Sequence, residues 1–176
     1  MSQENEKKFS ELYQKYASYM YGVCLRYTGN KEDAEDIMQD GFVKVYNNID
    51  KLKDIINVKA WIKRIMINTA LNLYRHNKII DFKSIDEGTY DIYKSYEQDA
   101  IQKLTTNELL SVIQELPEGY RLVFNLYAIE GYKHREIAEM LNINEGTSKS
   151  QFSKARSNLK KLIDKKLNIV DVNNEK

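Results

Sequence analysis

Turn-forming residues are scarce in this chain, and their scarcity limits the folds that it can adopt. The 176 residues include one proline and seven glycines. A β-sheet protein of this length needs more turns than so few of these residues can provide. Hydrophobic residues instead recur every three or four positions, as they do along one face of an α-helix. The sequence therefore predicts an all-α fold.

The first part of the chain predicts three amphipathic helices that form one compact unit. The first helix should end at Thr28-Gly29-Asn30, where Gly29 suits a left-handed cap. The second should begin near Lys31, with acidic residues in its first turn, where the helix dipole favours them. Residues 50–57 are expected to form a loop, and residues 58–77 a third helix. One stripe of this third helix should contain Trp61, Ile65, Thr69 and Leu73.

Residues 79–103 predict a flexible acidic linker, because helical periodicity is lost there and acidic residues outnumber basic ones. The expected domains therefore cover residues 1–78 and 104–170. The second domain should contain several shorter helices, two of them at about 134–141 and 145–165.

The net charge of +1 hides an uneven distribution of basic residues. Residues 59–78 contain five basic side chains and no acidic one, and residues 145–166 contain seven basic side chains against two acidic ones. Two basic segments separated by an acidic one are unusual for an enzyme. They are typical of a protein that grips nucleic acid at two places.

Several classes of protein and site are disfavoured. No apolar run approaches the roughly 18 residues that a membrane span needs, and the polar N-terminus has no signal-peptide core. Cys24 is the only cysteine, so it lacks a disulfide or metal-binding partner, and a reducing cytoplasm fits. His76 and His134 stand apart from other ligands, and no phosphate loop or nucleophile motif occurs. We therefore expect a cytoplasmic protein that is not an enzyme and holds no cofactor or metal.

The stretch from Glu136 to Arg156, EIAEMLNINEGTSKSQFSKAR, predicts a helix-turn-helix. Asn142 falls at the sharp turn, where asparagine tolerates the left-handed backbone better than most residues. The inward-facing residues should be Ile137, Ala138 and Leu141 on the first helix and Phe152, Ala155, Leu159 and Leu162 on the second.

A recognition helix enters the major groove of DNA with its N-terminal half forward, so the polar side chains there are candidate contacts. Glutamine and lysine can read base edges, while threonine, serine and arginine can hold phosphates. An ordinary helical hairpin with a solvated basic face is the competing interpretation of this pattern. The candidate DNA-binding residues, expected on the outer surface, are Thr147, Ser148, Lys149, Ser150, Gln151, Lys154 and Arg156.

The segment KAWIKRIMINTALNLYRHNK is a second candidate surface. It combines basic side chains, which follow phosphates, with aromatic and amide groups, which suit splayed single-stranded bases. The same pattern fits an amphipathic helix in which Trp61 belongs to the core. The pattern alone leaves both interpretations open.

Three motifs, in order, resemble one family: DAEDIMQDGFVKVYNNI, VKAWIKRIMINTALNLYRHNK and ELPEGYRLVFNLYAIEGYKHREIAEMLNINEGTSKSQFSKARSNLKKLI. Over residues of about 8–165 the chain resembles the group IV, or extracytoplasmic-function, sigma factors of bacterial RNA polymerase. The resemblance implies a σ2-like domain over residues 1–78 and a σ4-like domain over residues 104–170. It also implies three partners: core RNA polymerase, promoter DNA and an anti-sigma factor.

The resemblance assigns roles within both domains. The helix that contains DAEDIMQDGF matches the surface for the coiled coil of the polymerase β′ subunit, which implies an interface at Asp36, Gln39, Asp40 and Phe42. The helices at about 108–131 match the region that binds the β flap, and the helix-turn-helix matches the reader of the −35 element. The loop 48–54 and the helix that follows match the part that melts the −10 element and captures a flipped base. The residues implied in melting are Leu52, Lys53, Trp61, Lys63, Arg64, Asn68, Asn72 and Arg75.

The chain departs from the family pattern at four of these positions. Leu52 stands where an aromatic residue is common, and Asn72 where aspartate is common. Ser148 replaces a usual valine. Gln151 replaces a usual basic residue, and from this we predict a contact to adenine rather than guanine.

Two other functions compete with the sigma-factor interpretation. A free-standing transcriptional regulator would have a similar C-terminal helix-turn-helix, as LuxR-type regulators do, but it leaves residues 33–78 without a role. A nucleic-acid-processing enzyme with an accessory helix-turn-helix would need a metal or acid–base constellation, and the sequence contains none.

Overall fold

The computed structural model describes residues 3–80 and 105–174, and every regular element in these two stretches is helical. The prediction of an all-α fold is therefore confirmed. The chain divides into two units, Met1–Phe82 and Lys83–Lys176, each with its own internal contacts. Most of the predicted acidic linker lies outside the described residues, and its first two positions belong to the end of a helix.

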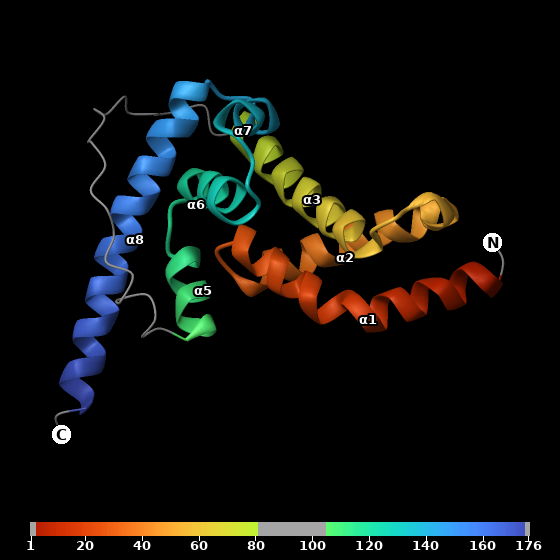
Figure 1. The fold of residues 1–176 in the computed structure, drawn as a ribbon, viewed down its shortest axis with the longest axis horizontal. Coiled ribbons are helices and arrows are strands. Elements are labelled where there is room, and N and C mark those ends of the chain that lie inside the picture. The colour runs from red at the N-terminus through yellow and green to blue at the C-terminus, as the bar shows by residue number, and fades with distance from the viewer. Residues whose placement is uncertain (1–2, 81–104, 175–176) are drawn as a thin grey trace. The chain divides into compact units, whose positions relative to one another are not determined.

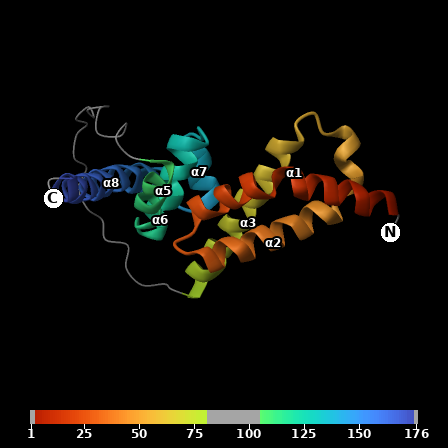
Figure 2. The same ribbon diagram turned by 90° about the horizontal axis from the view of Figure 1, so that it is seen from below.

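Three helices build the first unit: α1 (Gln3–Tyr27), α2 (Lys31–Asn47) and α3 (Val58–Ile80). Each of the three packs against the other two, as Figures 1 and 2 show. A short 3-10 helix, η1 (Ile49–Asp54), occupies part of the stretch that was predicted to be a loop. Side chains from all three helices form the core, among them Met20, Val23, Cys24, Ala34, Ile37, Val45, Ile62, Met66 and Leu71.

The turn between α1 and α2 is held by side chains. The Thr28 hydroxyl donates a hydrogen bond to the carbonyl oxygen of Cys24 at 3.2 Å, and the Asn30 side chain accepts one from the amide of Asp33 at 2.7 Å. The prediction of a left-handed cap at Gly29 was wrong, because Gly29 is not among the described residues with positive φ. The two polar side chains satisfy the helix ends instead.

The predicted stripe of α3 does not coincide with the buried face of the helix. Leu73 is exposed and Trp61 and Ile65 are only partly buried, although Thr69 is buried. Because α3 packs against both α1 and α2, its buried face is wider than one stripe and is centred on Met66. The residues of α3 that are buried are Ile62, Met66, Ile67, Thr69, Ala70, Leu71 and Tyr74.

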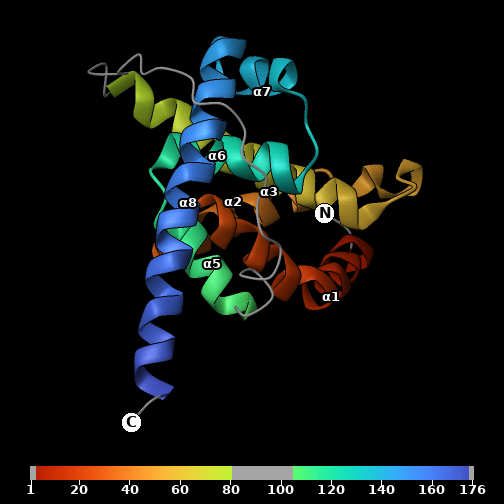
Figure 3. The ribbon, with the colours of Figure 1, turned by 60° about the vertical axis from the view of Figure 1, so that its left-hand side comes forward.

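The second unit contains α5 (Thr106–Gln114), α6 (Glu118–Phe124), η2 (Asn125–Ile129), α7 (His134–Leu141) and α8 (Glu145–Asn174). The element η2 is a π-helical turn that continues α6. Figure 3 shows α7 beside the N-terminal end of the long helix α8, with α6 and α5 further along it. One apolar cluster joins Val112 of α5 and Leu116, which follows that helix, to Ala155 and Leu159 of α8.

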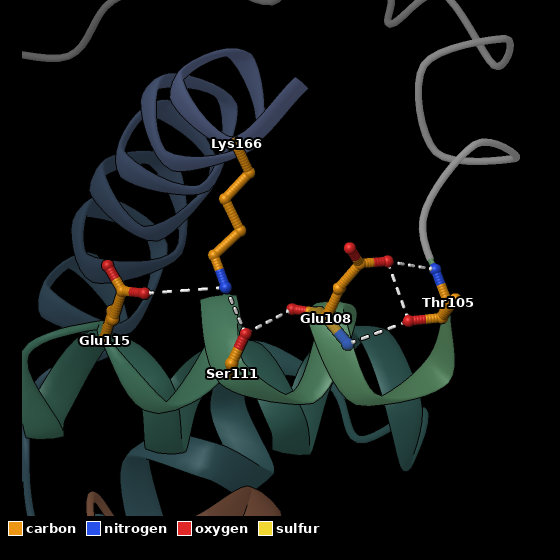
Figure 4. Close-up of polar contacts among 5 residues, drawn as sticks. All are labelled: Thr105, Glu108, Ser111, Glu115 and Lys166. Atoms are coloured by element: carbon orange, nitrogen blue, oxygen red, sulfur yellow. Dashed lines mark hydrogen bonds and ion pairs between the residues drawn. The ribbon is translucent and has the colours of Figure 1, made fainter. Parts of the chain in front are cut away.

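Polar contacts fasten α5 at its start and to α8. Thr105 and Glu108 form a capping box, in which the Glu108 amide donates to the Thr105 hydroxyl and the Thr105 amide donates to the Glu108 carboxylate. Lys166 of α8 reaches the Ser111 hydroxyl and lies 3.8 Å from the Glu115 carboxylate (Figure 4). The part of α8 beyond residue 159 therefore stabilises the position of α5.

Candidate nucleic-acid and partner interfaces

The predicted helix-turn-helix is present as α7, a turn at residues 142–144 and the start of α8. Asn142 adopts the left-handed conformation, with φ of 53°, as its place at the turn predicted. The amide of Ile143 donates to the carbonyl oxygen of Ala138 at 3.0 Å, which closes the end of α7. Ile137, Ala138 and Leu141 are buried, as predicted.

The candidate contacts on α8 differ in exposure. Lys149 is exposed and forms an ion pair of 2.6 Å with Glu145, one turn earlier. An exposed pair of this kind stabilises little, so Lys149 can exchange the carboxylate for a phosphate at small cost. The Ser150 hydroxyl donates to the carbonyl oxygen of Thr147 at 3.0 Å. The partly exposed candidates are Thr147, Ser150, Lys154 and Arg156.

The expected surface position of Ser148 was wrong. Its exposed fraction is 0%, and its Oγ lies 2.9 Å from Nδ1 of His134, the first residue of α7. Ser148 precedes Phe152 by four residues, so it lies on the same helical face as the inward-facing residues of α8. This spacing was visible in the sequence, but the hydroxyl group of serine favoured a surface assignment.

The sequence indicates no metal or catalytic role for His134, because no other ligand stands near it. In the structure His134 lies inside the helix-turn-helix. Its ring stacks on Tyr127, with centroids 4.3 Å apart and planes at 13°, and Phe152 meets it edge-on. Burial lowers the pKa of His134 from 6.5, and the charge of Lys149 lowers it further, while Glu145 opposes the shift. The imidazole is thus biased toward its neutral form.

The expected surface position of Gln151 was also wrong in part. Its side chain is partly buried, and Oε1 is inaccessible and has no hydrogen-bond partner among the described residues. The amide lies against Gly119 of α6, 3.3 Å from where a Cβ on that glycine would stand. Close packing of α6 on α8 therefore holds Gln151 between the helices, so we no longer predict its contact to adenine.

On α3 four of the predicted melting residues share one exposed face. Arg64, Asn68, Asn72 and Arg75 are all exposed and follow one another at intervals of four, four and three residues. This spacing places them along one side of the helix. The guanidinium of Arg75 donates to the Asn72 side-chain oxygen, which holds one basic and one amide group together.

The other predicted melting residues differ from one another in exposure. Lys53 is exposed, whereas Leu52, Trp61 and Lys63 are partly buried. The amide of Trp61 donates to the Asn57 carbonyl oxygen at 3.0 Å, and the Asn57 side chain accepts from the amide of Ala60. These bonds fix the start of α3 next to η1. The side chain of Trp61 is therefore neither fully buried in the core nor fully exposed to solvent.

A groove of about 710 Å³ runs between α1 and α2. Phe9, Tyr13 and Tyr46 supply an aromatic wall, and the exposed acidic side chains of Glu35 and Asp36 lie on its rim. An apolar floor with a negative rim suits a partner that carries both apolar and basic side chains.

Three of the four residues predicted to form a protein interface on α2 are exposed: Asp36, Gln39 and Asp40. The fourth, Phe42, is only 3% exposed, although it is among the residues that line the groove. Its ring packs against Phe9 and Tyr13, with centroids 6.2 and 4.8 Å away. Phe42 therefore supports the groove from below.

No group of three metal-ligating side chains occurs among the described residues. Cys24 is buried, and burial raises the pKa of its thiol to about 12. No helix in the part of the chain that the structure describes is long and apolar enough to cross a membrane.

Comparison with known proteins identifies the family. The model of Sigma-70 region 2 matches residues 12–79, and that of Sigma-70, region 4 matches residues 106–159. The RNA polymerase sigma factor SigZ of Bacillus subtilis is 30% identical over 130 residues, which are 74% of this chain and 72% of SigZ. The ECF RNA polymerase sigma factor SigW of the same organism is 29% identical over 167 residues, 89% of each chain. The chain belongs to the extracytoplasmic-function sigma factors.

A solved structure supports the fold of this sigma factor. The sigma factor RpoE from Bartonella quintana, determined in complex with the anti-sigma factor NepR, is similar over 90% of this chain and 98% of its own, with 21% identity and a TM-score of 0.51. The region 2 match covers the exposed face of α3 and, apart from Phe9, the residues that line the groove between α1 and α2. The region 4 match covers the helix-turn-helix and ends at residue 159, although α8 continues to Asn174.

Proposed function

We propose that this sigma factor binds core RNA polymerase and directs it to start transcription at particular promoters. The observation that carries the proposal is the exposed face of α3 in the region 2 unit, where two amides, Asn68 and Asn72, lie between two guanidinium groups, Arg64 and Arg75. Guanidinium groups hold phosphates, and amides can bond to the edges of unpaired bases. The face therefore suits a melted −10 element.

The region 4 unit reads the −35 element as duplex. Thr147, Lys149 and Ser150 lie at the start of α8, the part of a recognition helix that enters the major groove. Lys154 and Arg156 lie further along and hold the DNA backbone. Ser148 does not contact bases, because its side chain is buried, and Gln151 is held against Gly119 of α6.

The acidic side of α2 meets the polymerase. Asp36, Gln39 and Asp40 contact basic side chains of the β′ coiled coil, and the groove beside them receives its apolar residues. The helices α5 and α6 bind the β flap. Residues 1–78 act as the σ2-like domain, residues 104–170 as the σ4-like domain, and residues 79–103 connect them.

Three further statements belong to the same proposal. The chain itself catalyses no reaction, since catalysis belongs to the polymerase that it joins. It works in the cytoplasm, where the polymerase and the promoter are. An anti-sigma factor regulates it by covering its polymerase-binding surfaces, as the similarity to an RpoE structure that contains one supports.

The proposal is tested by transcription in vitro with core RNA polymerase and a library of promoter fragments. Defined transcripts that need both proteins are the expected result. Asp40→Ala should reduce them by weakening the association with core polymerase, whereas Asp164→Ala, an exposed acid on α8 outside the candidate surfaces, should not. Lys149→Ala should reduce them through the −35 element, with the exposed Lys160→Ala as its control.

A pre-melted template isolates the role of α3. Arg64→Ala should lower initiation on a closed promoter, and a mismatch bubble across the −10 element should restore most of it, because the variant is impaired in opening DNA. Duplex binding by the chain alone, without any association with core polymerase, would instead support the free-standing regulator and overturn the proposal.

A further inference from the structure

His134 and Ser148 are joined by a side-chain hydrogen bond that links the two helices of the helix-turn-helix. His134 begins α7, and Ser148 lies in the first turns of α8, with Nδ1 and Oγ 2.9 Å apart. Ser148 is fully buried, so water cannot substitute for the imidazole as its partner. The bond therefore persists as long as the two helices are packed.

The imidazole is itself held in place by aromatic rings. Tyr127 of η2 stacks on it at 4.3 Å, and Phe152 of α8 lies edge-on at 5.8 Å. Tyr127 and Phe152 also contact each other, with centroids 4.5 Å apart. The position of Nδ1 is thus set by Tyr127, which lies outside the helix-turn-helix, as well as by the ring of Phe152 on α8.

Apolar side chains also hold the helix-turn-helix together, and their contacts are less directional. Ile137, Ala138 and Leu141 of α7 are buried. Apolar contact depends on area and tolerates small rotations, whereas a hydrogen bond weakens steeply when its angle changes. The polar pair is therefore a directional contact that constrains how far α8 is turned about its own axis.

Rotation of α8 matters because Ser148 lies between proposed DNA contacts. Thr147 precedes it and Lys149 follows it, and Ser150 is one position further. Successive residues of a helix point about 100° apart, so holding Ser148 inward orients its neighbours toward the groove.

We propose that His134 is a positioning residue for −35 recognition, which sets the rotation of α8 through its bond to Ser148. The inference rests on the proposed function, because it concerns the same recognition helix. It adds a residue that does not contact DNA yet determines which −35 sequences are preferred. A purely stabilising role for the bond would change the amount of folded protein and leave the order of preference unchanged.

The experiment uses the full chain in holoenzyme and a set of promoters that share one −10 element and differ only in the −35 element. The measurement is the ratio of initiation rates between the best and the other −35 elements. Ser148→Ala and His134→Phe, which keeps an aromatic ring for stacking, should each reduce that ratio, by about fivefold if the bond contributes as a typical one does. Ser157→Ala, an exposed serine of the same helix, should leave it unchanged.

Two further variants keep the test decisive. The double variant His134→Phe with Ser148→Ala should match either single variant, because both remove the same bond. His134→Asn, whose side-chain amide can take the place of Nδ1, should restore part of the ratio. These comparisons remain valid if the variants also lower thermal stability, since the ratio is taken between promoters for one protein sample.

Several results would overturn the inference. Equal loss of initiation on every −35 element would assign the bond to stability alone, and so would additive effects in the double variant. A wild-type holoenzyme that initiates without any preference among −35 elements would instead contradict the proposed function of the helix-turn-helix, which is a separate failure.

Discussion

Met66 of α3 lies directly over Gly41 of α2. A Cβ added at Gly41 would stand 2.9 Å from Cε of Met66 and closer still to its sulfur. Val45 of α2 and Ile62 of α3 are also fully buried. Glycine at this position therefore leaves room for the Met66 side chain, which would have to shift if a Cβ were added.

Gly41→Ala is expected to destabilise the first unit by about 2 kcal/mol, because Met66 is buried and has little room to move. Gly22→Ala is the matched control: it also lies within a helix, and its Cβ would meet nothing within 4 Å. That substitution should stabilise the unit by about 0.5–1 kcal/mol. Chemical unfolding followed by the fluorescence of Trp61, the single tryptophan, measures both. Equal effects of the two substitutions on the free energy of unfolding would show that the contact between Gly41 and Met66 does not constrain the residue at position 41.

The single cysteine should be inert in the folded protein. Cys24 is 1% exposed, and burial raises its pKa to about 12, so neither access nor thiolate formation is favoured at neutral pH. We expect a thiol reagent to label it at pH 8 only as fast as the first unit opens, and within seconds in denaturant. Gly41→Ala should accelerate labelling, and Gly22→Ala should not. Rapid labelling of the native wild type would contradict the buried position.

The capping box at the start of α5 should stabilise the second unit. Thr105→Ala removes the hydroxyl that accepts from the Glu108 amide, and loss of a cap of this kind costs about 1 kcal/mol. Hydrogen exchange of the α5 amides should become correspondingly faster. Thr106→Ala changes the next residue, which is exposed and lies outside the box, and serves as the control. Unchanged exchange in Thr105→Ala would mean that Lys166 and the apolar contact alone hold α5.

The stability of the second unit should decrease as the pH falls below about 6.5. The folded pKa of His134 is lowered, so the unfolded chain binds its proton more readily and acid favours unfolding. This contribution is fully present above the unfolded pKa and is lost as the pH falls toward the folded one. The carboxyl groups of Glu108 and Glu145, whose pKa values are lowered from 4.5, act in a more acidic range.

The free energy of opening of the α7 and α8 amides at pH 7.5 and 5.5, obtained from hydrogen exchange after correction for the intrinsic exchange rate at each pH, measures this effect. His134→Phe should remove the difference between the two pH values, because it has no titrating group at that position. A difference that persists unchanged in this variant would assign the pH dependence to another residue.

Much of the architecture followed from local patterns. The spacing of Ile137, Ala138 and Leu141 predicted the helix that the structure shows over His134–Leu141, and the tolerance of asparagine for positive φ predicted the turn at Asn142. Both depend on interactions within a few residues, which the order of residues specifies directly. The family resemblance added the division into two regions, and the family models match the chain in both.

The candidate surfaces were less predictable, because exposure depends on what packs against each residue. Arg64, Asn68, Asn72 and Arg75 could be assigned to one exposed face, since polar residues at helical spacing rarely face a core. Ser148 and Phe42 could not be placed in the same way. Ser148 is buried because His134 satisfies its hydroxyl, and Phe42 is buried because α1 covers it with two aromatic rings.

The sequence by itself determined the helical fold, the helix-turn-helix and the family, because each is encoded in periodicity and motif order. The tertiary structure decided which face of each helix is available to a partner. In the tertiary structure the buried face of α3 is centred on Met66, and Gln151 lies against Gly119. The physical reason is that the rotation of a helix is set by its neighbours, through close approach at glycines and bonds between distant side chains, and not by its own pattern alone.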